Sequence, residues 1–229
     1  MPSEAAPRIR VAVVDSGVHA AHPHVGGVAG GIAIGEDGGI SDDFVDRLGH
    51  GTAVAAAIRE KAPDAELFAV KVFWRTLATD VPTLVRGIDE ACGHGARVVN
   101  LSLGTTDARH RDALAQAVER ARRRGAFVVA AAPDGQAEWL PGALDDVVAV
   151  ELDWSCNRHE YRVATAAGRS RIVASGYPRD IPGVPRDKNL RGISFAVANA
   201  SGFVARALRA VPVSDMSGLF EILRGSGAL

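Results

Sequence analysis

Short apolar runs alternate with helical patterns through the first two thirds of the chain, and this alternation constrains the fold more than any other feature. The apolar runs are rich in Val, Ala and Leu and are bounded by Gly, Pro or Asp, as buried strands are. They are Ile9–Val14, Leu67–Val72, Arg97–Leu101, Ala126–Ala131 and Asp146–Val150. The helical patterns between them are Thr52–Lys61, Pro82–Cys92 and Ala108–Arg124. Strand, helix and strand repeated in this way predict an α/β fold of three layers, with a mainly parallel sheet flanked by helices on both faces.

The last third of the chain is less regular. Two runs are possible further strands, Tyr161–Thr165 and Arg171–Ser175, and two patterns predict helices, Phe195–Arg209 and Met216–Arg224. The segment Tyr177–Arg191 is rich in Pro, Gly and Arg and lacks periodicity, so it predicts a loop. The glycines of Gly26–Gly39 likewise predict a flexible surface loop.

Chain length and net charge limit the classes of protein to which this sequence can belong. With 229 residues, of which 47% are hydrophobic and 23% charged, the chain is expected to form a single domain over residues 1–229, with residues 1–7 as a flexible segment. The 26 basic and 27 acidic residues give a net charge of −1, which argues against nucleic acid or a membrane surface as a partner held by bulk charge. No stretch reaches the roughly 18 consecutive apolar residues of a membrane helix.

The cysteines and the N-terminus bear on the compartment. Cys92 and Cys156 each lie in a segment that is typical of packed structure, so we expect free thiols rather than a disulfide. Met1–Pro7 lacks the basic and long apolar regions of a secretory signal. Both observations favour a cytoplasmic location.

Three short motifs carry an acid, an imidazole and a hydroxyl. They are Asp15-Ser16-Gly17, His50-Gly51-Thr52 and Gly192-Ile193-Ser194. Taken alone, each has an ordinary interpretation as a strand end, a helix start or an N-cap. Together they supply a nucleophilic serine, a base that takes its proton and an acid that orients the base. Asp15 follows the first strand directly, where sites on parallel sheets gather.

The order and neighbours of these motifs resemble those of subtilases, the subtilisin-like serine proteases. The resemblance runs from Val11 to Gly202 and includes four more segments: His22-Pro23 after the first motif, Gly49-His-Gly-Thr, Val70-Lys71-Val72 and Val98–Gly104. It implies that Ser194 is the nucleophile, that His50 is the general base and then the general acid, and that Asp15 orients His50. It implies neither a cofactor nor a metal in the reaction.

The resemblance also implies where a substrate lies. Ser102, Leu103 and Gly104 match the segment that pairs with an extended substrate and forms a wall of the pocket for the residue before the cut. Thr76, Leu77 and Ala78, within Thr76–Thr79, match the opposite substrate-binding edge. The expected partner is therefore an extended peptide or protein substrate bound by β-augmentation. A further partner protein and the oligomeric state stay open.

The oxyanion hole departs from the family pattern. Ala132-Pro133-Asp134 stands where the family has Ala-Gly-Asn, and Ile193 stands where it usually has threonine. An ionised Asp134 donates no hydrogen bond, which leaves the backbone N–H of Ser194 as the evident donor. Loss of one such donor costs roughly 10²- to 10³-fold in kcat, a figure measured in this family. Protonation of Asp134 by burial, or donation by Gln136 or Asn157, would compensate.

The function predicted from these residues is that of a serine endopeptidase of narrow specificity, for example one that removes the leader of a precursor peptide. The damaged oxyanion hole leaves open a catalytically impaired module that binds a peptide or a partner. A third alternative is acyl transfer to an amine, as in peptide cyclisation.

Other conspicuous side chains have ordinary interpretations. His19, His22 and His24 make a weak metal pattern. The acidic residues Asp37, Asp42, Asp43 and Asp46 indicate a solvated loop rather than a calcium site. Arginines at 120 and 122–124 complement a helix dipole. Trp74 and Trp139 are candidates to line a peptide cleft.

Overall fold

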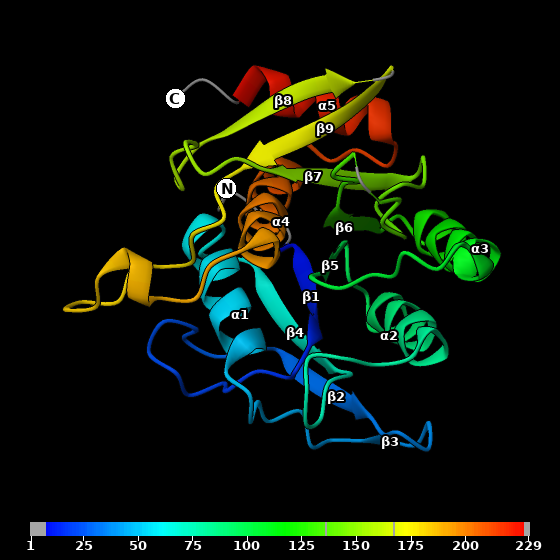
Figure 1. The fold of residues 1–229 in the computed structure, drawn as a ribbon, viewed down its shortest axis with the longest axis vertical. Helices are drawn as coiled ribbons and strands as arrows, with labels where there is room; N and C mark the ends of the chain where they lie inside the picture. Colours follow the sequence, from blue (N-terminus) through cyan, green and yellow to red (C-terminus); the bar gives the residue numbers. More distant parts are fainter. Residues whose placement is uncertain (1–7, 136, 167, 227–229) are drawn as a thin grey trace, which may run out of the picture.

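The computed structural model describes residues 8–135, 137–166 and 168–226, and its strands join into one nine-stranded sheet (Figure 1). The strands are β1 (Arg10–Asp15), β2 (Gly30–Ile34), β3 (Ile40–Ser41), β4 (Glu66–Lys71), β5 (Val98–Leu101), β6 (Phe127–Ala131), β7 (Val147–Leu152), β8 (Tyr161–Ala166) and β9 (Arg169–Ala174). Their order is β3-β2-β4-β1-β5-β6-β7-β9-β8. Every neighbouring pair is parallel except the two edge pairs, β2 with β3 and β8 with β9.

Helices cover both faces of this sheet, which confirms the predicted three layers. The described α-helices are α1 (His50–Lys61), α2 (Val81–Gly93), α3 (Arg111–Arg123), α4 (Ile193–Ala210) and α5 (Met216–Ser226). α2 and α3 pack on one face, and α1, α4 and α5 pack on the other. Short 3₁₀ turns occupy Ala108–His110 and Arg186–Lys188. The flexible segment expected at residues 1–7 lies outside the described residues.

Helix α2 illustrates how the sequence specifies these elements. Asp80 caps its first turn by accepting a hydrogen bond from the Thr83 N–H at 2.8 Å, and Pro82 occupies a position where no N–H is needed. Leu84, Ile88 and Ala91 recur at helical spacing and are buried against the sheet. Full burial of a side chain such as Leu84 stabilises the fold by about 1.5–3 kcal/mol.

The interpretation of Gly26–Gly39 as a flexible surface loop was wrong, because β2 lies within it. Gly30–Ile34 pairs in parallel with β4, with Gly31 opposite Ala69. A Cβ on Gly31 would lie 2.6 Å from Cγ of Phe44 and 2.8 Å from Cβ of Ala69. This glycine therefore permits close packing of a strand and does not indicate a mobile chain.

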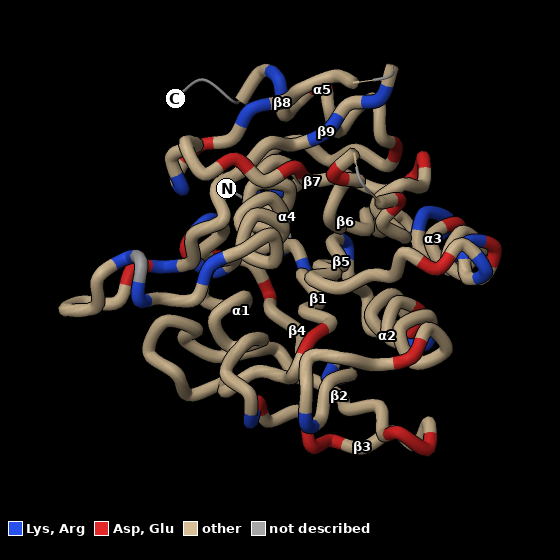
Figure 2. Tube along the Cα trace, in the orientation of Figure 1, with Lys and Arg blue, Asp and Glu red and all other residues tan. Residues whose placement is uncertain are grey.

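Charged residues of both signs are spread over the molecule (Figure 2), and many of them form ion pairs. On α3, Arg120 donates two hydrogen bonds to Asp89, at 2.9 and 2.7 Å, and Arg122 and Arg123 both contact Glu119. These pairs account for the arginines in the last turn. Within the described residues, no helix has the length and apolar character that a bilayer crossing requires.

The strand order places the candidate site. β1 is flanked by β4 on one side and β5 on the other: the chain leaves β1 toward β2 on the β4 side and later crosses from β4 to β5 on the opposite side. Parallel sheets bind ligands outside the carboxyl ends of strands at such a point. Asp15 ends β1 and therefore stands at this crevice.

Candidate active site

Asp15 and His50 form a partly buried hydrogen-bonded pair at the end of β1. Asp15 is fully buried, and His50 is the first residue of α1. Nδ1 of His50 lies 2.8 Å from Oδ1 and 3.0 Å from Oδ2 of Asp15. A carboxylate at Nδ1 favours the tautomer with its proton on that nitrogen. Nε2 is then left as the basic nitrogen.

The start of α1 approaches the turn after β1 closely. A Cβ on Gly51 would lie 2.2 Å from the carbonyl oxygen of Gly17 and 3.2 Å from Cβ of Asp15. The Gly51 N–H donates to Oγ of Ser16 at 2.9 Å. Only glycine after His50 allows this approach, which brings the imidazole to the acid.

Two opposing effects set the pKa of His50. Burial disfavours the charged imidazolium, whereas the hydrogen bond and charge of Asp15 and the charge of Asp46 favour it. The net result raises the pKa of His50 above its ordinary value of 6.5. Because a general base must be neutral, a reaction that uses His50 is expected to accelerate as the pH rises through this raised pKa.

Asp46 is buried beneath the first turn of α1, so its assignment to a solvated acidic loop was wrong. Its Oδ1 accepts hydrogen bonds from the Ser16 hydroxyl at 2.9 Å and from the Gly49 N–H at 2.8 Å. Its Oδ2 accepts from the N–H and the hydroxyl of Thr52, at 2.8 and 2.6 Å. Burial raises the pKa of Asp46, but these hydrogen bonds outweigh it and lower the pKa overall. The sequence signal was its position just before a helix start.

Ser194 is the second residue of α4, directly after Gly192 and Ile193. Its side chain borders a large cavity, and its carbonyl oxygen lies 3.4 Å from the Ser102 hydroxyl. The next residue, Phe195, lies beside His50, with ring centroids 5.8 Å apart. Among the described residues no hydrogen bond joins the Ser194 hydroxyl to His50. Such bonds are often long without substrate and shorten in the Michaelis complex.

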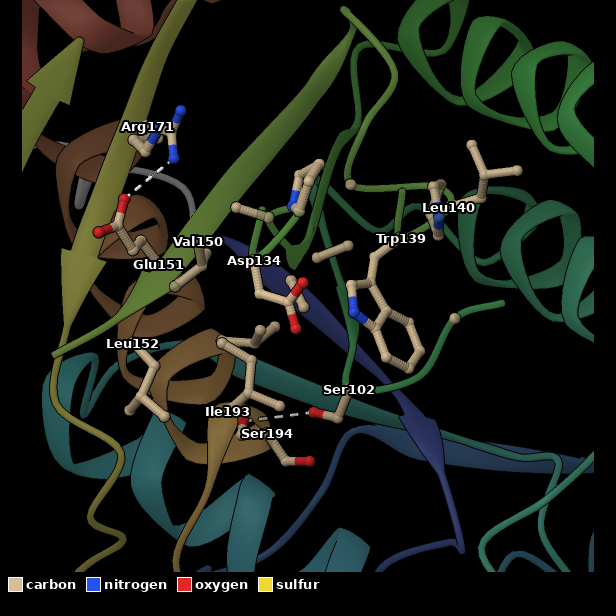
Figure 3. A pocket seen from close by; sticks show the side chains of 18 of the residues that line it. Ser102, Asp134, Trp139, Leu140, Val150, Glu151, Leu152, Arg171, Ile193 and Ser194 are labelled. Atoms are coloured by element: carbon tan, nitrogen blue, oxygen red, sulfur yellow. Dashed lines mark hydrogen bonds and ion pairs between the residues drawn. The ribbon is translucent and has the colours of Figure 1, made fainter. Parts of the chain in front are cut away.

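The cavity beside Ser194 has a volume of about 760 Å³. Its lining comes from the segment after β5, the end of β6 and the loop that follows it, the end of β7, the start of α4 and one residue of β9 (Figure 3). Most of these side chains are apolar. The ionisable ones among the described lining residues are Asp134, Glu151 and Arg171. The sequence interpretation had not assigned Glu151 or Arg171 to the site.

Ser102, Leu103 and Gly104, which the resemblance assigns to substrate binding, form one wall of this cavity. The residue that follows them, Thr105, exchanges two backbone hydrogen bonds with Leu140, at 2.9 and 2.8 Å. A Cβ on Gly104 would lie 2.4 Å from the Leu140 carbonyl oxygen. The wall is therefore fixed to the segment that carries Trp139, which also lines the cavity.

Thr76, Leu77 and Ala78 do not line the cavity of Ser194. Thr76 and Ala78 border a separate cavity of about 170 Å³ that also includes Trp74, and Leu77 is exposed. Nearby, Thr79 shares another cavity, of about 300 Å³, with Leu103 and Gly104. Of the predicted edge Thr76–Thr79, the structure thus brings Thr79 to the wall that Leu103 and Gly104 form.

The predicted oxyanion position faces the nucleophile's cavity. Asp134 and Ile193 line the same cavity as Ser194, and a carboxylate oxygen of Asp134 accepts a hydrogen bond from the Ala137 N–H at 3.1 Å. Asn157 is exposed in the turn after β7 and is not part of the lining. Gln136 lies outside the described residues.

The histidine-rich segment has a local role. The His24 N–H donates to Nδ1 of His22 at 3.2 Å, and the two rings pack edge to face with centroids 5.3 Å apart. In the part of the chain that the structure describes, no group of three or more His, Cys, Asp or Glu side chains is placed to hold a metal ion.

Comparisons with known proteins agree with this geometry. The model of the subtilase family matches residues 7–218. Thermitase of Thermoactinomyces vulgaris is 30% identical over 84% of this chain and 72% of its own length. Subtilisin DY of Bacillus licheniformis is 27% identical over 91% of this chain and 80% of its own. For the minor extracellular protease Epr of Bacillus subtilis, 34% identical, the match spans 62% of this chain but only 23% of Epr.

A solved structure shares the fold. The crystal structure of a lanthipeptide protease superimposes with a TM-score of 0.70, covering 95% of this chain and 79% of the other, at 20% sequence identity. The family model, the relatives and the shared architecture lead to one conclusion: the chain belongs to the subtilase family of serine proteases.

Proposed function

We propose that this chain is a serine endopeptidase that cleaves an extended peptide through an acyl-enzyme on Ser194. The observation that carries the proposal is the Asp15–His50 pair, with distances of 2.8 and 3.0 Å between Nδ1 and the two carboxylate oxygens, at the carboxyl end of β1 and beside the first turn of α4. This arrangement supplies a base whose orientation is fixed next to a helix-terminal hydroxyl.

In the proposed reaction, Oγ of Ser194 attacks the scissile carbonyl carbon while its proton passes to Nε2 of His50. Asp15 stabilises the imidazolium that forms. Collapse of the tetrahedral intermediate breaks the C–N bond, and the amine leaves with the proton from His50. Water then attacks the ester, again with His50 as base, and releases the acid and Ser194. The positive end of α4 favours negative charge developing at the serine.

The proposed substrate is a precursor peptide cut at one or few positions. Its support is the family membership, together with the structural likeness to a protein described as a lanthipeptide protease. The wall Ser102–Gly104 suits a peptide bound as an added strand, with the side chain before the scissile bond in the cavity. We also propose a cytoplasmic location, supported by the free thiols Cys92 and Cys156.

A second candidate is a catalytically impaired module that binds the same peptide without cutting it. Asp134 and Ile193, both of which line the cavity, favour this alternative, because neither an ionised carboxylate nor an isoleucine side chain donates to an oxyanion. Acyl transfer to an amine uses the same Ser194 ester and differs only in the group that attacks it.

A fluorophosphonate probe tests the proposal. The wild-type protein should be labelled covalently, and Ser194→Ala should not. Asp15→Asn should label far more slowly, because His50 loses the acid that orients it. Absence of serine-dependent labelling from pH 5 to 9 would favour the binding module. Mass spectrometry of the products would separate hydrolysis, which adds water, from cyclisation, which does not.

A further inference from the structure

An ion pair lies at the end of the cavity that is opposite to the nucleophile. Arg171 of β9 donates a hydrogen bond to Oε2 of Glu151 on β7 at 3.0 Å, and both side chains line the cavity. Figure 3 shows this pair on the far side of the cavity from Ser102 and Ser194. The Glu151 side chain is 49% exposed and that of Arg171 is 23% exposed. A ligand that filled the cavity would therefore remove water from both.

Strand register explains why these two charges meet. Glu151 is opposite Val173 in the parallel β7–β9 pair, and Arg171, two residues before Val173, lies on the same face of the sheet. The other arginine that β9 carries on this face, Arg169, donates at 2.8 Å to the Ala143 carbonyl oxygen outside the cavity. Arg171 is thus the cation among the described lining residues.

The rest of the cavity is mainly apolar. Its walls include alanines and glycines together with larger side chains: Leu103, Trp139, Leu140, Val150, Leu152, Ile193 and Val197. Asp134 is the remaining charged residue of the described lining, and it lies nearer to Ser194 than the pair does in Figure 3. The end of the cavity opposite to Ser194 therefore carries balanced charge beside apolar walls.

We infer that the Glu151–Arg171 pair determines the charge that the cavity accepts, and that the paired state selects a large uncharged side chain for the residue before the scissile bond. The inference rests on the proposed function, because it takes this cavity as the pocket for that residue. An aromatic or long aliphatic side chain gains contact with the apolar walls without separating the pair.

A charged side chain meets a penalty in this pocket. A lysine must approach the guanidinium of Arg171, and a glutamate must approach the carboxylate of Glu151 and pass Asp134. Removal of one partner leaves the other charge uncompensated beneath the bound side chain, where exclusion of water strengthens its electrostatic effect. Arg171→Gln should then favour a basic residue before the cut, and Glu151→Gln should favour an acidic one.

The test uses three fluorogenic peptides that differ only in having Phe, Lys or Glu before the scissile bond. For the wild-type protein we expect kcat/KM to be highest with Phe. Arg171→Gln should raise the Lys-to-Glu ratio of kcat/KM roughly tenfold, and Glu151→Gln should lower it by about the same factor, equivalent to ~1.4 kcal/mol. The charge-swapped variant, Glu151→Arg with Arg171→Glu, should return the ratio toward that of the wild type.

The matched control is Arg162→Gln, which removes an arginine from β8, next to β9, that pairs with Asp153 and does not line the cavity. It should leave the ratio unchanged. Thermal unfolding of each variant identifies loss of fold, which would change all three rates together and not their ratio. Single variants whose Lys-to-Glu ratio stays within about twofold of the wild type would overturn the inference.

A binding measurement keeps this test separate from the proposed function. The same pocket substitutions are placed in Ser194→Ala, and dissociation constants for the three peptides are measured by fluorescence anisotropy. If the wild-type protein does not cleave but the dissociation constants follow the predicted charge order, the proposed function fails and the inference stands. If it cleaves and neither readout responds to charge, the inference fails alone.

Discussion

Asp134→Asn is the substitution that most directly addresses the altered oxyanion hole. Asp134 lines the cavity of Ser194, and one of its carboxylate oxygens accepts the Ala137 N–H at 3.1 Å. Asparagine is nearly isosteric, so its amide oxygen can keep this hydrogen bond while its NH₂ group replaces the second oxygen. The variant thereby gains a donor without a change of backbone.

The magnitude follows from what one oxyanion donor contributes. Loss of such a donor in a subtilisin costs roughly 10²- to 10³-fold in kcat, or about 2.7–4 kcal/mol. Because the introduced amide would still be anchored by Ala137 and not freely oriented, we expect the lower end, a gain of about 10²-fold in kcat. Removal of the negative charge contributes part of this gain, and the new N–H contributes the rest.

Hydrolysis of a fluorogenic peptide by wild type, Asp134→Asn and Asp134→Ala separates the two parts. Asp134→Ala removes the charge but adds no donor, so it should raise kcat by about tenfold or less. The control Asp145→Asn removes an acid whose side chain is 94% exposed and outside the cavity, and it should change nothing. Equal or lower kcat for Asp134→Asn than for the wild type would refute the assignment of residue 134 to the oxyanion position.

Further predictions concern titration, stability and thiol reactivity. For the wild type, kcat/KM should rise with pH through the raised pKa of His50, as measured by stopped-flow pH profiles. Asp15→Asn should shift this rise in kcat/KM to lower pH and should lower kcat about 10⁴-fold. Asp46→Ala should lower the free energy of unfolding in urea by about 2–4 kcal/mol, because buried N–H donors lose their acceptor. Because the pKa of Asp46 is lower in the folded protein than in the unfolded chain, ionised Asp46 stabilises the fold at pH values above its unfolded-state pKa of about 3.9. The difference in unfolding free energy between Asp46→Ala and the wild type should therefore shrink as the pH falls through the folded-state pKa. Burial raises the pKa of Cys92 to about 11, so iodoacetamide at pH 8 should alkylate Cys156 first. Peptide mapping measures the order of modification, and modification of Cys92 before Cys156 would contradict the buried position of Cys92.

The core strands of the sheet could be predicted from the sequence because a strand that is buried on both faces is a continuous run of apolar residues. Val11–Val14 and Val147–Val150 are continuous apolar runs, and the structure places both in the sheet. β2 could not be predicted, because the fit of Gly31 between Phe44 and Ala69 depends on side chains that lie far away along the chain. A glycine in a loop and a glycine in close packing look alike in sequence.

The residues of the site likewise differ in whether the sequence allows their positions to be predicted. The Asp15–His50 pair was predictable because the motifs that carry Asp15, His50 and Ser194 occur together, in an order and with neighbours that resemble those of a known family. Asp46 was misassigned because an aspartate near Asp42 and Asp43 is usually solvated, whereas here its carboxylate accepts a hydrogen bond from Ser16, which follows β1 and lies far away along the chain. The contact of Glu151 with Arg171 could not be predicted, since it depends on the register of β7 against β9.

The measurement that tests the central claim most directly is mass spectrometry of the protein quenched in acid during turnover of a slowly deacylating peptide ester. We predict a mass increase equal to the acyl group, located on the peptide that contains Ser194 and absent from Ser194→Ala. Hydrolysis of the ester at full rate by Ser194→Ala, or an acyl group on any other residue, would contradict the account.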